Sequence, residues 1–150
     1  MATTARWSLP PMLLDESFGI IPLRRRGDGV WEVFLILHKS GHHWSFPKGH
    51  KDNPAEDPFE AAKRELFEET GLDIANRLPL SPLHETYEFR HHGTRIRKKV
   101  EYFAAEVIGE PILQPEEIRD GRWIPLAEAH MLLTFKEAQF ICARVIQQLK

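Results

Sequence analysis

Three glutamates near the middle of the chain have the spacing of a metal site. Glu65 precedes Glu68 by three residues and Glu69 by four, so a helix would place all three carboxylates on one face. Like charges at this spacing destabilise a bare helix, whereas hard divalent cations such as Mg²⁺ prefer oxygen ligands. A solvated acidic helix end is the alternative interpretation, because glutamate is mostly an exposed residue.

The residues around these glutamates predict the helix that would position them. Asp57 suits an N-cap, Pro58 suits the first helical position, and Gly71 suits the residue that follows the last turn. Together they predict a helix over residues 58–70. A Pro-Lys-Gly turn at residues 47–49 comes shortly before it.

The stretch from this turn to the end of the helix resembles the Nudix box, G-x5-E-x7-R-E-U-x-E-E-x-G-U, where U is aliphatic. The residues that fit are Glu56, Arg64, Glu65, Leu66, Glu68, Glu69, Gly71 and Leu72. One departure lies in the loop, where six residues instead of five separate Gly49 from Glu56. The path of that loop stays open, but the helix carboxylates are unaffected.

The resemblance implies a metal site and roles for single residues. The ligands it implies for Mg²⁺, or for Mn²⁺ in its place, are the carbonyl of Gly49 and the carboxylates of Glu65, Glu68, Glu69 and Glu117. Glu69 ranks first and Glu117 second as the general base, while an exposed loop residue is the alternative for Glu117. Arg64 is expected to fix a carboxylate through a bidentate pair, and Glu56 to tie the loop to the helix.

Three phrases outside the box, at residues 43–50, 98–103 and 121–136, resemble one subgroup, the asymmetrical diadenosine tetraphosphate hydrolases. In that subgroup a histidine and lysines contact the phosphate chain, a tyrosine stacks on adenine, and a phenylalanine forms the second wall of the base site. The residues that this assigns here are His43, Lys48, Lys99, Tyr102 and Phe135. Lys98 is the alternative to Lys99. A surface histidine pair, a solvent-facing strand and a core phenylalanine are the structural alternatives.

Three functions are therefore open. The first is asymmetric hydrolysis of diadenosine tetraphosphate to ATP and AMP. The second is Nudix pyrophosphohydrolysis of RNA 5′ ends, other nucleoside polyphosphates or inositol pyrophosphates, although the Pro-Lys-Gly-His turn favours the first. The third is a non-catalytic nucleotide sensor, which would be expected to lose a carboxylate of the box. None is lost here.

Length and composition indicate the domain organisation, the partners and the location to expect. The chain has 150 residues, 42% of them hydrophobic, and a net charge of −2, which predicts one Nudix domain over residues 1–150. This charge gives no global attraction to nucleic acid, so RNA 5′ ends are the only nucleic-acid partner considered. A single cysteine, Cys142, is expected to be buried and suits a reducing cytosol. We expect a cytoplasmic monomer that acts on a small molecule, without a signal peptide or membrane span.

The order of elements predicts an α/β fold. We expect an arm or edge strand over residues 1–16, irregular structure over 73–82, and Thr134 as the N-cap of the last helix. The expected strands lie at residues 18–25, 31–38, 84–90, 98–108 and 122–124, and the expected helices at 58–70, 126–132 and 136–149. Strands and helices in this order predict a mixed sheet with helices on its faces. The family resemblance implies the Nudix-type α/β/α sandwich.

Overall fold

The computed structural model describes residues 11–150 and has an eight-stranded mixed sheet at its centre. The strands are β1 (Met12–Arg25), β2 (Trp31–His38), β3 (Trp44–Ser45), β4 (Lys48–Gly49), β5 (Asp73–Arg77), β6 (Leu83–His91), β7 (Thr94–Ile108) and β8 (Ile118–Pro125). The helical elements are α2 (Pro58–Thr70), the 3-10 turn η1 (Leu126–Glu128), α3 (Ala129–Leu132) and α4 (Lys136–Leu149). The main path of the sheet is β3-β2-β1-β7-β5, and β4, β6 and β8 pair with β1, β7 and β2. Only the pair β1–β7 is parallel among the described strands.

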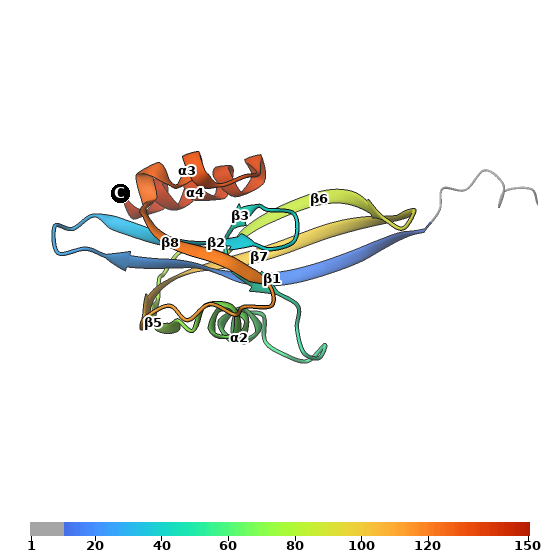
Figure 1. Ribbon diagram of the computed structural model, residues 1–150, viewed down its shortest axis with the longest axis horizontal. Helices are drawn as coiled ribbons and strands as arrows, with labels where there is room; N and C mark the ends of the chain where they lie inside the picture. Colours follow the sequence, from blue (N-terminus) through green and yellow to red (C-terminus); the bar gives the residue numbers. More distant parts are fainter. Residues whose placement is uncertain (1–10) are drawn as a thin grey trace, which may run out of the picture.

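Different helices cover the two faces of the sheet, as Figure 1 shows with α3 and α4 above it and α2 below. Alternation along the strands sorts the core into two clusters. Ile21 packs in the cluster that contains Ile141 of α4, whereas its neighbour Ile20 packs in the cluster that contains Leu66 of α2. The predicted α/β/α sandwich is confirmed. Cys142 is buried in the first cluster, as expected.

Local capping sets both ends of α2. The Asp57 side chain accepts hydrogen bonds from the backbone N–H groups of Phe59 and Glu60, at 3.1 and 3.2 Å. Gly71 has a φ of 73°, in the left-handed region that favours glycine, and its N–H donates to the Phe67 carbonyl. The predicted helix is confirmed with its bounds, and these bounds determine where its carboxylates lie.

Two strand assignments differ from expectation. The first ten residues lie outside the described residues, but β1 runs unbroken from Met12 to Arg25, so the expected edge strand and the strand expected at 18–25 are one element. Over residues 12–16 it pairs with β7 alone and forms an edge, as expected, whereas Leu23–Arg25 lies between β2 and β7. The segment expected to be irregular contains β5, which pairs with β7 across a register shift between Ile74 and Asn76. This strand is mostly exposed and polar, so it lacks the hydrophobic alternation that predicts strands.

The start of α4 also differs from expectation. Phe135 occupies the N-cap position without a side-chain cap. The hydroxyl of Thr134 instead accepts the backbone N–H of Trp44 at 2.9 Å. This bond attaches the segment before α4 to β3, far away in sequence, and so fixes Phe135 beside the loop that precedes β3. The other expected helices and strands are present.

None of the helices in the described part of the chain has the length and apolar character needed to cross a membrane.

Candidate active site

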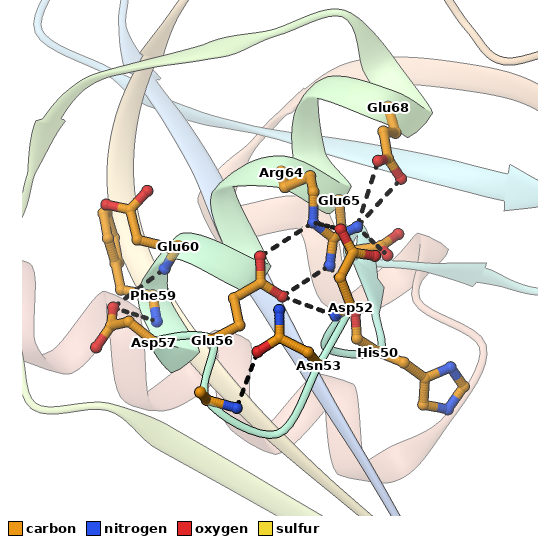
Figure 2. Close-up of polar contacts among 11 residues, drawn as sticks. His50, Asp52, Asn53, Glu56, Asp57, Phe59, Glu60, Arg64, Glu65 and Glu68 are labelled. Carbon is orange, nitrogen blue, oxygen red and sulfur yellow. Dashed lines mark hydrogen bonds and ion pairs between the residues drawn. The ribbon is translucent and has the colours of Figure 1, made fainter.

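One guanidinium joins the loop after β4 to helix α2 (Figure 2). Arg64 donates from Nε and Nη2 to the two oxygens of Glu56, at 3.1 and 3.0 Å. Nη2 also donates to the His50 carbonyl at 2.9 Å, and Nε lies 3.0 Å from a carboxylate oxygen of Asp52. The bidentate pair and the role of Glu56 as a tie between loop and helix are confirmed.

The longer loop closes on itself before it reaches α2. The N–H of Glu56 donates to the Asn53 carbonyl at 3.1 Å, and the N–H of Asp52 donates to Oε1 of Glu56 at 2.8 Å. The turn at Asn53 thus takes up the six residues between Gly49 and Glu56. The Glu56 carboxylate still reaches Arg64.

A cavity of about 370 Å³, here called the carboxylate cavity, opens between α2 and the loop. The residues that line it are Ser17, His38, Lys48, Gly49, His50, Lys51, Asp52, Glu65, Glu69, Lys98 and Glu117. The structure therefore brings together four of the five expected metal ligands. The fifth, Glu68, does not line this cavity; its side chain is 53% exposed and accepts from Arg64 Nη1 at 3.3 Å.

The carboxylates are packed directly against the Lys48-Gly49 turn. The carboxyl group of Glu65 lies so close to Gly49 that any Cβ atom at this position would overlap with it. Oε1 of Glu69 accepts the backbone N–H of Lys48 at 2.9 Å, and Oε1 of Glu65 accepts from Arg64 Nη1 at 3.1 Å. A side chain at residue 49 would therefore displace the Glu65 carboxyl group from its place against the turn.

This crowding shifts the protonation of the carboxylates. Burial, followed by the charge of Glu65, raises the pKa of Glu69 from 4.5 to about 8, against the opposing effects of the Lys48 charge and backbone N–H. Burial and the charge of Glu68 also raise the pKa of Glu65. A bound cation would relieve both effects, and oxygen donors of this kind suit Mg²⁺.

The donors fit a divalent cation in chemistry, but their side chains are not yet gathered around one point. Across residues 11–150, no three His, Cys, Asp or Glu side chains stand close enough together to hold an ion as they are placed. Two of the carboxylates are instead engaged by Arg64 and by the Lys48 backbone. Cation binding would therefore draw these carboxylates away from Arg64 and the Lys48 backbone toward a common point in the cavity.

A second cavity, of about 450 Å³, lies next to the first, and Lys48 lines both. We call it the aromatic cavity. Its lining residues are His43, Ser45, Lys48, Glu85, Tyr87, Glu88, Phe89, Tyr102, Phe135, Glu137 and Ala138. Four of the five expected substrate-binding residues thus meet here. Phe135 is 51% exposed, so its ring is accessible to a ligand.

Two stacked histidines form one side of this junction. The ring of His43 lies 4.4 Å from that of His38, at an interplanar angle of 16°, and 5.3 Å from that of Phe135. Burial, followed by the charge of Lys48, lowers the pKa of His38 to about 4 and also lowers that of His43. The positive charge at the junction therefore comes from lysine.

The fifth expected residue, Lys99, is exposed and lines neither cavity. Its neighbour Lys98 is 8% exposed, lines the carboxylate cavity, and donates to Asp15 at 3.0 Å and to the Ser17 hydroxyl at 2.5 Å. Successive residues of a strand point to opposite faces, so only Lys98 shares a face with Tyr102. That alternation was the signal that could have distinguished the two lysines.

The structure does not leave Tyr102 a free ring face for stacking. It is 1% exposed, packs edge-on against Phe46 with centroids 5.3 Å apart, and donates its hydroxyl to Glu85 at 3.1 Å. Tyr102 can therefore contact a ligand only at the floor of the aromatic cavity. Tyr87, which sequence reasoning missed, is half-buried on β6 and lines the cavity wall. Tyr87 lies on the same face of β6 as Glu85 and Phe89, but no sequence signal shows that this face opens on a cavity.

The chain belongs to the Nudix family, because the model described as NUDIX domain matches residues 13–144. It is therefore a hydrolase acting on phosphoric anhydride bonds. Over 141 residues it is 34% identical to the bis(5′-nucleosyl)-tetraphosphatase [asymmetrical] of Rattus norvegicus, covering 83% of this chain and 94% of the rat protein. It is 27% identical to an RNA pyrophosphohydrolase of Rhodopseudomonas palustris, covering 91% and 87%. The fold matches a C. elegans Ap4A hydrolase binary complex with a TM-score of 0.69 at 24% identity, covering 90% and 97%.

The raised pKa of Glu69 predicts how the stability of the metal-free protein depends on pH. A carboxyl whose pKa is raised on folding stabilises the native state below its unfolded pKa, and this contribution is lost as the pH rises through the folded pKa of about 8. Relative to Glu69→Gln, which carries no titrating proton, the wild type should lose on the order of 1–3 kcal/mol of unfolding free energy between about pH 5 and about pH 9. Denaturant unfolding in the presence of a chelator measures this difference. Glu68→Gln, at an exposed position, is the control, and parallel wild-type and Glu69→Gln curves would contradict the prediction.

Proposed function

We propose that this chain is an enzyme that uses Mg²⁺, or Mn²⁺ in its place, to cleave diadenosine tetraphosphate asymmetrically into ATP and AMP. The observation that carries the proposal is the pair of adjoining cavities that share Lys48. One is lined by carboxylates suited to metal and phosphate, and the other by aromatic rings suited to a base. The likeness to the rat tetraphosphatase over most of both chains supports the same substrate class.

Two lysines are available to bind the phosphate chain. Within the described residues the ammonium of Lys48 forms no ion pair, although it lies at the junction of the two cavities. Lys98 reaches the carboxylate cavity from β7, and Asp15 and Ser17 hold its ammonium group there. A polyphosphate that runs from one cavity to the other would pass both charges, and lysine is a common phosphate ligand.

The carboxylate cavity supplies the reaction centre. Glu65, Glu69, Glu117 and the Gly49 carbonyl would hold the metal, with Glu68 as a further ligand after its side chain turns. Divalent ions, when bound, neutralise phosphate charge and lower the pKa of a water molecule. Glu69 ranks first and Glu117 second as the base that accepts the proton.

Arg64 is better described as a positioning residue. Its guanidinium is engaged by Glu56, Glu65 and Glu68, so it holds the carboxylates without lining the carboxylate cavity.

The aromatic cavity is the proposed base site. Phe135 and Tyr87 offer ring surface at its walls, His43 lies beside Phe135, and Tyr102 closes the floor. Base–aromatic stacking contributes about 1–3 kcal/mol per base. The saturated, polar ring of an inositol pyrophosphate cannot stack on this surface as an aromatic base does, so the cavity favours a nucleotide.

A second candidate is an RNA 5′ end, favoured by the likeness to the Rhodopseudomonas palustris RNA pyrophosphohydrolase. A panel that contains diadenosine tetraphosphate and 5′-triphosphorylated RNA separates the two. A non-catalytic nucleotide sensor would show no turnover of either compound. A single domain over residues 1–150, a monomeric state and a cytoplasmic location stay predictions.

Glu69→Gln should abolish nearly all turnover of diadenosine tetraphosphate. The amide is isosteric but brings no charge to a cation and accepts no proton from water. Steady-state kcat with Mg²⁺ measures the loss. A variant that kept more than about a tenth of wild-type kcat would exclude Glu69 as ligand or base, since a tenfold loss is only about 1.4 kcal/mol. Retained secondary structure by circular dichroism excludes misfolding as the cause.

Tyr87→Ala should raise KM for diadenosine tetraphosphate roughly tenfold and change kcat little. Stacking far from the reacting phosphorus binds ground state and transition state alike, and losing it costs about 1–3 kcal/mol. Phe140→Ala is the matched control, because Phe140 is 69% exposed on α4 and lines neither cavity. Equal KM values for the two variants would show that the base binds outside the aromatic cavity.

The bond that breaks is expected to lie at a fixed reach from the bound base. With one adenine in the aromatic cavity and the following phosphates on Lys48 and Lys98, water attacks the fourth phosphorus. ATP is then the leaving group. In ¹⁸O-labelled water the label should appear in AMP, and a five-phosphate substrate should give ATP and ADP. Chromatography with mass spectrometry measures the products. Two ADP molecules from the tetraphosphate would contradict binding from one end, and label in ATP would place attack on the third phosphorus.

A further inference from the structure

Glu85, on the floor of the aromatic cavity, has a carboxylate that is incompletely hydrogen-bonded. Oε1 of Glu85 accepts the Tyr102 hydroxyl at 3.1 Å. No group among residues 11–150 donates to Oε2, and this oxygen is not closed off from solvent. Because Glu85 lines the cavity, its free lone pairs are available to a ligand that enters there.

Opposing effects act on the protonation of Glu85. Burial raises the pKa of its carboxyl group overall, whereas the Tyr102 hydroxyl and the nearby Lys48 ammonium favour the ionised carboxylate. Glu137, in the first turn of α4, lines the same cavity and adds negative potential. An ionised carboxylate only accepts hydrogen bonds. The floor of the cavity therefore presents acceptors.

Glu88 lines the same cavity but is already engaged. Its two oxygens lie 3.0 Å from an Arg97 nitrogen and 3.7 Å from an Arg95 nitrogen. It points no unused charge at a ligand. It therefore provides a comparison for Glu85, with the same side chain on the same strand, at the cavity but on the opposite face of β6 and already paired.

We infer that Glu85 makes the aromatic cavity select guanine over adenine, so that guanosine-containing dinucleoside polyphosphates are the preferred substrates. This inference rests on the proposed function. Guanine presents N1–H and N2–H side by side, and one carboxylate accepts both. Adenine presents a single donor, N6–H, beside the N1 lone pair, which a carboxylate repels. A glutamine at residue 85 offers one acceptor and one donor, the complement of adenine.

The sharpest test uses one substrate that contains both bases, guanosine-adenosine tetraphosphate. The base in the aromatic cavity keeps three phosphates, so guanine selection gives GTP and AMP, whereas adenine selection gives ATP and GMP. Wild type should favour GTP and AMP by roughly 5- to 100-fold, the discrimination expected from one bidentate pair. Glu85→Gln should bring the ratio to one or reverse it, and Glu88→Gln should keep the wild-type ratio.

Equilibrium binding of GMP and of AMP, measured by calorimetry, separates this inference from the proposed function. Neither GMP nor AMP contains a phosphoric anhydride bond, so the enzyme cleaves neither, and the measurement is independent of turnover. If no dinucleotide is cleaved but GMP binds more tightly than AMP in wild type and not in Glu85→Gln, the proposed function fails, while the guanine selectivity that Glu85 gives the cavity stands. A wild-type product ratio near one, or equal GMP and AMP affinities, overturns the inference and leaves the proposed function intact. The wild-type measurements decide this even if Glu85→Gln fails to fold.

Discussion

The guanidinium of Arg64 is the interaction on which the rest of the site depends. Helix α2 carries carboxylates at spacings that repel one another, and Arg64 compensates two of them, Glu65 and Glu68, while it also binds Glu56 in the loop. Loop and helix are therefore fixed relative to each other. This registration allows the Glu65 carboxyl to rest on Gly49 with no room for a side chain. A weaker link would let the turn and the helix separate, and the metal donors with them.

The two cavities both carry carboxylates, and they meet at Lys48. The carboxylate cavity concentrates negative charge, which has to be balanced before a polyphosphate can approach. Lys98 is already paired with Asp15, so part of its charge is balanced before a phosphate binds. Lys48 forms no ion pair among the described residues, and its pKa is lowered by burial against the attraction of Glu85 and Glu69. A bound phosphate would therefore stabilise the charged form of Lys48 more than that of Lys98, which already has a partner.

The parts of this site that could be predicted from sequence are those fixed by local contacts. The caps of α2 and the ion pairs around Arg64 either lie within one helical turn or depend on the box spacing, so the sequence determines them directly. Alternation along β7 places Lys98, and not Lys99, on the face of Tyr102, but which face of β7 opens on the cavities depends on its pairing with β1 and β6, which sequence alone does not fix. Burial of Tyr102 likewise follows from Phe46, a residue of another segment.

The base site shows why long-range contacts decide function where local patterns do not. Its walls come from β6, β7 and the start of α4. Two hydrogen bonds, from the Trp44 N–H to the Thr134 hydroxyl and from the Thr134 N–H to the Trp44 carbonyl, hold Phe135 beside His43. The residue that was expected to cap a helix thus joins two distant segments instead. Burial and the charge of Lys48 keep the neighbouring histidines neutral, so they contribute shape and hydrogen bonds but no charge. In the proposed site, phosphate binding would therefore depend on lysines, and recognition of the base would depend on the polar groups at the floor of an aromatic cavity.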